Sequence, residues 1–241
     1  MSTYVYGIAR SSHPGLPEKL GGVGEPAQPV RVLTRGDLVA LVSDAPDSLR
    51  PKRRDLLAHQ NVLAEAGAGG SVLPMRFGGV SPDDDTVLSV LGEREAHYLE
   101  RLDALDNKVE YNVKASHDEE SVLHQVLADD PDLRALSEAN RAAGGGSYDQ
   151  KLALGERVVA AVQQREARDA VLVQQALEAT AADVKPGPES GGWLANISFL
   201  VDRDRSDAFV NAVDELKQAN PHLVLTVNGP LPPYSFVESE G

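Results

Sequence analysis

The chain has 241 residues, a length that allows one large domain or two small ones. Hydrophobic residues make up 41% of it and aromatic residues only 5%, so a core must depend on Val, Leu, Ile and Ala. The formal net charge is −14, opposite in sign to the basic surface that nucleic-acid binding requires. The chain contains no cysteine, which excludes disulfides, thiol catalysis and cysteine-based zinc sites.

Basic residues are densest at Arg50, Lys52, Arg53 and Arg54. We favour the solvated first turn of a helix over an anion-binding patch there. No apolar run approaches the roughly 18 residues that a membrane span needs, and the N-terminus lacks the basic and apolar regions of a signal peptide. We therefore expect a cytoplasmic protein that does not span a membrane.

The first half predicts an α+β domain at residues 1–107. Strands are expected at residues 3–9, 30–34, 38–43 and 71–77, which are rich in β-branched and aromatic residues. Arg35, Gly36 and Asp37 form the turn between the second and third strands. Helices are expected at residues 51–66 and 81–105, the second capped by Ser81. Glu95 lies on the apolar face of that helix, and we expect it to pair with Arg76.

The second half, residues 108–241, predicts a ferredoxin-like domain with extra long helices. Strands are expected at residues 108–115, 182–185, 193–202 and 222–227. Helices are expected at residues 118–143, broken near Pro131, and at 148–180 and 203–220. The order β-α-(α)-β-β-α-β suits a ferredoxin-like sandwich, and an extended Pro-rich tail follows at residues 229–237.

The sequence contains no catalytic or phosphate-binding signature. There is no G-x-x-x-x-G-K-[ST] loop and no G-x-S-x-G elbow. Gly144, Gly145 and Gly146 precede a helix, where a glycine linker is favoured over an anion site. We expect no enzymatic activity, no cofactor and no bound metal.

Two histidine positions need a separate interpretation. His117 and His124 are seven residues apart on an expected helix, and about 10 Å is too far for both to bind one ion. His59 lies on the apolar stripe of the first helix. We favour a buried histidine that is hydrogen-bonded to backbone, with a binding role as the alternative.

Four segments resemble the gas vesicle protein F/L family over nearly the full length of the chain. They are residues 4–8 (YVYGI), His59 with Val62, residues 72–78 (VLPMRFG), and the ending from residues 196–201 (NISFLV) through 229–237 (GPLPPYSFV). The ending is the most specific part, because a strand, a helix, a strand and this tail rarely occur together by chance.

The resemblance implies a two-domain accessory protein of gas vesicle formation, with a role in buoyancy and no catalytic residues. It implies contact with the hydrophobic shell protein, gas vesicle protein A, and with other accessory proteins, in a chaperone- or nucleation-like role. The F-like and L-like subgroups stay open. The candidate protein-binding residues are His59, Met75, Arg76, Phe77, Pro232, Pro233 and Tyr234. For residues 232–234, packing back across the sheet is the favoured alternative. The competing function is a small-molecule-binding regulatory module of ferredoxin-like fold.

Overall fold

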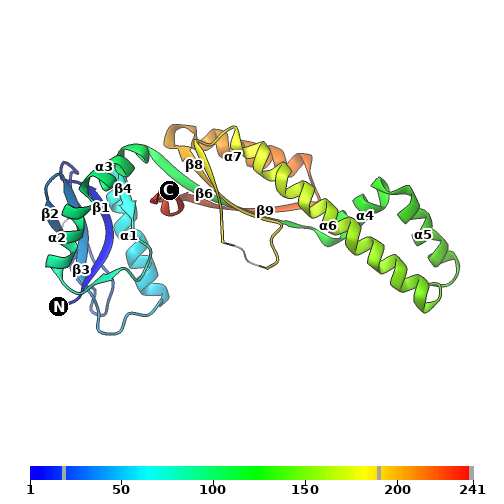
Figure 1. Cartoon of the computed structure of the whole chain (residues 1–241), viewed down its shortest axis with the longest axis horizontal. Coiled ribbons are helices and arrows are strands. Elements are labelled where there is room, and N and C mark those ends of the chain that lie inside the picture. The colour runs from blue at the N-terminus through cyan, green and yellow to red at the C-terminus, as the bar shows by residue number, and fades with distance from the viewer. Residues whose placement is uncertain (18–19, 189–190, 239–241) are drawn as a thin grey trace. The chain divides into compact units, whose positions relative to one another are not determined.

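The computed structural model describes residues 1–17, 20–188 and 191–238. They form mixed helix and sheet structure with two sheets, which confirms the predicted α+β class (Figure 1). The chain divides into two compact units. Unit 1 contains Met1–Glu110 and the described part of Gly229–Gly241, and unit 2 contains Tyr111–Asn228.

Unit 1 is built on an antiparallel sheet in the order β2-β3-β1-β4, with β5 also paired to β1. Its strands are β1 (Thr3–Arg10), β2 (Arg31–Arg35), β3 (Leu38–Asp44), β4 (Val72–Pro74) and β5 (Val80–Ser81). The edge strand β4 is shorter than the predicted 71–77 and ends at Pro74, with one further backbone hydrogen bond from Met75 N to the Tyr6 carbonyl oxygen at 2.8 Å. The turn at Gly36 has a φ of 55° and joins β2 to β3 as predicted.

Three helices pack against this sheet. They are α1 (Arg53–Gly69), α2 (Asp84–Glu93) and α3 (Glu95–Ala104). Helix α1 contacts β1 and β4, α2 contacts β2 and β3, and α3 contacts β1 and β4. Because β1 and β3 are buried along almost their whole length, both faces of the sheet are covered.

The single helix predicted at residues 81–105 is wrong in two respects. Asp83 is the N-cap instead of Ser81, since its carboxylate accepts a hydrogen bond from the backbone N of Thr86 at 2.8 Å. Arg94 then takes a non-helical conformation, with φ −114° and ψ 18°, and divides the segment into α2 and α3.

Unit 2 is built around the four-stranded sheet β7-β8-β6-β9. The division between the units falls within two of these strands, after Glu110 in β6 and before Gly229 in β9. Its strands are β6 (Lys108–His117), β7 (Asp183–Pro186), β8 (Ala195–Asp202) and β9 (Leu223–Leu231). Its helices are α4 (Glu119–Asp129), α5 (Pro131–Ala142), α6 (Tyr148–Glu178) and α7 (Ser206–Ala219), with short 3-10 turns at Arg203–Arg205 and, in the tail of unit 1, at Tyr234–Phe236. The central position of β6 and β8 agrees with a ferredoxin-like order, which stays a prediction.

Helices α6 and α7 pack together and both contact β8, so they cover one face of this sheet (Figure 1). The rings of Tyr111 and Phe209 stack beneath them at 4.9 Å, and Phe199 lies 5.4 Å from Phe209. The remaining part of α6 packs against α4 and α5. Its start is fixed by a capping box, in which Ser147 and Gln150 bond reciprocally to each other's backbone N–H groups.

Candidate functional site

Tyr4 on β1 and His59 on α1 form a buried hydrogen-bonded pair in unit 1. Tyr4 Oη lies 2.9 Å from His59 Nδ1, and His59 Nε2 lies 3.0 Å from the carbonyl oxygen of Met75. A carbonyl can only accept, so Nε2 carries the proton and Nδ1 accepts from the Tyr4 hydroxyl. The Tyr4 oxygen in turn accepts a hydrogen bond from the backbone N of Gly78 at 3.2 Å. Every polar atom of the pair therefore has a partner.

Burial keeps this pair uncharged. It lowers the pKa of His59, and the hydrogen bond to the Met75 carbonyl offsets only part of that effect. Burial also raises the pKa of Tyr4, against the opposing effect of the hydrogen bond from Gly78. His59 is thus buried and hydrogen-bonded to backbone, as the sequence predicted. It packs beneath residues 75–77, through its bond to Met75 and its contact with the ring of Phe77.

The segment after β4 covers this pair. The ring of Phe77 lies 5.8 Å from the ring of His59 and 6.0 Å from that of Tyr4. Met75 and Phe77 are half-buried, whereas Arg76 between them is exposed. The predicted ion pair between Arg76 and Glu95 is wrong. Glu95 instead accepts a hydrogen bond from the backbone N of Asp37 at 2.9 Å, because α3 places it beside the β2-β3 turn.

The C-terminal tail packs into unit 1. Ser235 donates to both carboxylate oxygens of Glu110, from its backbone N at 2.8 Å and from Oγ at 2.7 Å. Arg101 of α3 donates to the carbonyl oxygen of Phe236 at 2.7 Å, and the Phe236 side chain is fully buried. Burial, assisted by the charge of Glu110, raises the pKa of Tyr234 to about 12. These contacts group the tail with unit 1, whereas the sequence predicted it as part of the domain at residues 108–241.

The seven candidate protein-binding residues therefore all belong to unit 1. His59 and Pro233 are buried, and Met75, Phe77, Pro232 and Tyr234 are half-buried. Tyr234 packs against the hydrophobic core of unit 1, which buried residues of β1, β3 and α1 such as Tyr4, Leu41 and Leu63 form. Only Arg76 presents a largely exposed side chain. Of residues 232–234, Pro233 is buried and the other two are half-buried, so both the binding role and the packing alternative stay predictions.

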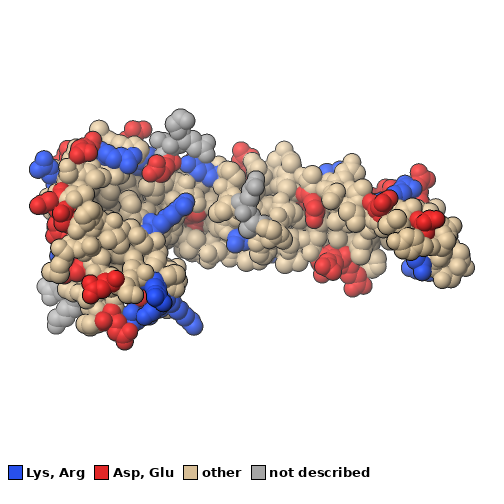
Figure 2. All heavy atoms as spheres, turned by 60° about the horizontal axis from the view of Figure 1, so that its bottom comes forward, with Lys and Arg blue, Asp and Glu red and all other residues tan. Residues whose placement is uncertain are grey.

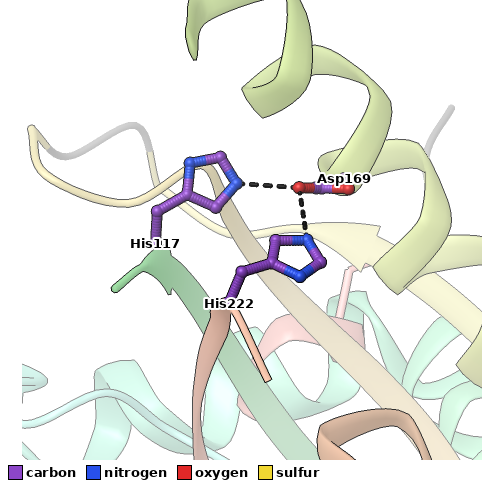
Figure 3. A group of neighbouring side chains, drawn as sticks. All are labelled: His117, Asp169 and His222. Atoms are coloured by element: carbon purple, nitrogen blue, oxygen red, sulfur yellow. Dashed lines mark hydrogen bonds and ion pairs between the residues drawn. The ribbon is translucent and has the colours of Figure 1, made fainter. Parts of the chain in front are cut away.

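Unit 2 contains a buried polar cluster that the sequence did not predict (Figure 3). His117 ends β6, Asp169 lies on α6, and His222 directly precedes β9. Asp169 Oδ2 lies 2.8 Å from His117 Nε2 and 2.9 Å from His222 Nε2. Arg165, one turn before Asp169, donates from Nε to both oxygens of that carboxylate, at 3.1 and 3.0 Å.

The environment of Asp169 keeps it ionised. Burial raises the pKa of Asp169, but the hydrogen bonds from His117 and Arg165 outweigh that effect and hold the pKa below its usual range. The expectation that His117 lies on a helix with His124 is wrong, because Asp118 caps α4 and leaves His117 in the strand. One feature of the sequence could have indicated this cluster. Asp169 is a charged residue on the inward, apolar stripe of a predicted helix, where a buried carboxylate needs polar partners.

Helix α6 also carries an apolar stripe that faces solvent. Tyr148, Leu152 and Val159 are 79%, 51% and 56% exposed. Their spacing of four and seven residues places them on one side of the helix. Val173 and Leu177, which fall on the inward stripe that the sequence predicted, lie on this same side of the helix near its C-terminal end and are buried there. The solvent-facing stripe is therefore the N-terminal stretch of that side, at residues 148–159, where the apolar side chains stay open to a partner.

Two other surface features bear on function. A cavity of about 240 Å³ in unit 1 is lined by polar residues, among them Arg10, His13 and Asp103, together with apolar ones such as Pro14 and Leu102. It is smaller than the pockets of roughly 300–1,000 Å³ that usually hold small ligands. On the face drawn in Figure 2, basic side chains are interspersed with acidic ones. Among the described residues, no helix combines the length and the apolar character needed to cross a bilayer.

Comparison with known proteins relates the chain to gas vesicle proteins. The family model described as "Gas vesicle synthesis protein GvpL/GvpF" matches residues 2–238. Gas vesicle protein F of Streptomyces sp. (strain CB03234) is 81% identical over 238 residues, which cover 99% of this chain and 100% of that protein. Gas vesicle protein L of the same organism is 31% identical over 255 residues, covering 97% of this chain and 91% of that protein.

Solved structures support the fold. The crystal structure of the gas vesicle protein GvpF from Anabaena sp. PCC7120 matches with a TM-score of 0.77 at 22% identity. The match covers 100% of this chain and 99% of the other. The GvpF structure from Microcystis aeruginosa matches with a TM-score of 0.73 at 23% identity, covering 99% of each chain.

Proposed function

The chain belongs to the gas vesicle synthesis protein GvpL/GvpF family, and from this premise we propose that it binds the hydrophobic shell protein, gas vesicle protein A, and assists its assembly. The family supports a role in gas vesicle formation. The specific role proposed is chaperone- or nucleation-like, in the cytoplasm and together with other accessory proteins. The chain is 81% identical to a gas vesicle protein F and 31% identical to a gas vesicle protein L, which favours the F-like subgroup.

The solvent-facing stripe of α6 is the observation that carries this proposal. An apolar shell subunit needs an apolar surface to shield it before assembly, and a helix face with side chains at positions i, i+4 and i+11 offers one. Tyr148, Leu152 and Val159 provide that surface with half or more of each side chain exposed. Capping by Ser147 keeps the first turn of the helix formed, so that Tyr148 is held in line with the others.

Residues 75–77 of unit 1 form a second candidate surface. Arg76 is exposed there, between the half-buried Met75 and Phe77, and the ring of Phe77 packs against His59. The neighbouring edge strand β4 is only three residues long and ends in Pro74, so it offers few backbone groups for pairing with another strand. The apolar stripe of α6 therefore fits the shell protein better.

Co-purification with the shell protein tests the proposal and distinguishes the two surfaces. Val159→Glu places a charge in the stripe, and we expect it to reduce recovery of co-expressed shell protein by about tenfold. Val171→Glu is the matched control, since Val171 lies on the same helix and is 53% exposed but is turned by about 120° around the axis. Loss of recovery with Arg76→Glu and not with Val159→Glu would assign the contact to unit 1.

A further inference from the structure

The most unusual feature of unit 2 is that its buried polar cluster cannot satisfy all of its members. His222 Nε2 lies 2.9 Å from an acceptor, Asp169 Oδ2, and 3.2 Å from a donor, Arg165 Nη2. A ring nitrogen carries either a hydrogen or a lone pair, so it can satisfy only one of these two neighbours. A conflict of this kind at a buried site requires an explanation, and an ion is one of the ordinary ones.

The donor atoms are of the kind and in the number that a transition metal uses. His117 Nε2, His222 Nε2 and Asp169 Oδ2 all lie within 4.8 Å of one another. Two imidazoles and one carboxylate suit Zn²⁺ and its neighbours in the first transition row, whereas Mg²⁺ and Ca²⁺ prefer oxygen alone. The three side chains are 6%, 1% and 4% exposed, and each comes from a different element of the fold (Figure 3).

We propose that His117, Asp169 and His222 bind one divalent transition-metal ion of the Zn²⁺ type, with Arg165 as the cation that occupies the site in its absence. Ion-to-ligand distances of about 2.0–2.2 Å require the two nitrogen atoms to close slightly and each nitrogen to move slightly away from the carboxylate oxygen. The bound ion joins β6, α6 and the start of β9.

Arg165 has a second carboxylate partner, Asp129, outside the proposed site. Its Nη1 donates to Asp129 Oδ2 at 2.8 Å, and its side chain is 20% exposed whereas the three ligands are almost fully buried. When the ion takes the lone pair of His222 Nε2, the guanidinium retains its pair with Asp129 at the surface. The Nδ1 atoms of both histidines are buried without a partner, and that cost is common to the two states.

Metal titration of the untagged full-length chain tests this proposal. After removal of metal with a chelator, calorimetry with Zn²⁺ should give one ion per chain, and Co²⁺ should give the absorption of a low-symmetry nitrogen and oxygen site. His117→Gln and Asp169→Asn should each weaken binding by at least tenfold. His124→Gln is the matched control, because His124 is an exposed histidine of the same unit, and it should bind as the wild type does.

Arg165→Gln separates a metal site from a purely structural hydrogen-bond network. It removes the competing positive charge, so Zn²⁺ should bind about tenfold more tightly. Unchanged or weaker binding in Arg165→Gln, no binding by the wild type, or equal binding by His117→Gln would each overturn the proposal. If Asp169→Asn does not fold, as circular dichroism would show, the comparison of His117→Gln with Arg165→Gln decides the outcome.

Discussion

Tyr4 donates its hydroxyl hydrogen to Nδ1 of His59 across 2.9 Å, and this bond joins the first strand of the protein to its first helix. The carbonyl of Met75 fixes the tautomer from the other side of the ring. The same two side chains support residues 75–77, one of the two surfaces considered for shell-protein binding. The contribution of this pair to the free energy of unfolding can be measured without any assay of shell-protein binding.

Replacement of the Tyr4 hydroxyl should destabilise unit 1. Tyr4→Phe leaves His59 Nδ1 and the backbone N of Gly78 without their partner, and we expect a loss of about 1–3 kcal/mol in the free energy of unfolding. Urea unfolding measures this loss. Tyr111→Phe is the control, because its ring is buried but among the described residues its hydroxyl makes no hydrogen bond, and it should change stability by less than about 0.5 kcal/mol. Equal effects of the two substitutions would contradict the account.

Stability should depend on pH through His59. Burial lowers its pKa in the folded state, so above about pH 6.5 both states are neutral and stability is complete. As the pH falls below 6.5 the unfolded state takes up the proton first, and stability decreases by at most about 1.4 kcal/mol per pH unit. His59→Gln removes this group, so its stability deficit relative to the wild type should shrink between pH 6.5 and 5.

The exposed His124 provides the reference for that experiment. His124→Gln should follow the wild-type unfolding curve at every pH between 7.5 and 5. A deficit in His59→Gln that stays constant over this range would show that the histidine is not held neutral by burial.

Removal of the Phe236 ring should release the tail from unit 1. The ring is fully buried, and Phe236→Ala should cost about 3–5 kcal/mol in the free energy of unfolding. Phe236→Leu retains most of the apolar volume and should cost less than about 1.5 kcal/mol. Increased cleavage of residues after 229 by protease should accompany the alanine substitution only. A change below 0.5 kcal/mol for Phe236→Ala would mean that the tail contributes little to the unit.

The sequence predicts most helices and strands of this protein because local signals mark their ends. Asp118 caps α4, the pair Asp130 and Pro131 separates α4 from α5, and Gly36 marks the turn between β2 and β3. Where several residues could cap a helix, as at Ser81 and Asp83, side-chain propensity alone selected the wrong one. Tertiary contacts decide such cases.

The site residues are harder to predict, because they meet through tertiary structure. Asp169 lies 52 residues from His117 and 53 from His222 along the chain, and no spacing rule relates them. The tail lies more than 100 residues from its partners Arg101 and Glu110. Its position in the chain, directly after the last strand, led to the prediction that it belongs to residues 108–241, whereas contact clustering groups it with unit 1.

Photo-crosslinking within cells that form gas vesicles tests the central claim most directly. A photoreactive amino acid at Leu152, in the solvent-facing stripe of α6, should capture the shell protein on irradiation. The same group at Gln164 is exposed on the same helix but is turned by about 120°, and it should capture little or none. Capture of the shell protein from both positions alike, or from neither, would contradict binding through this stripe.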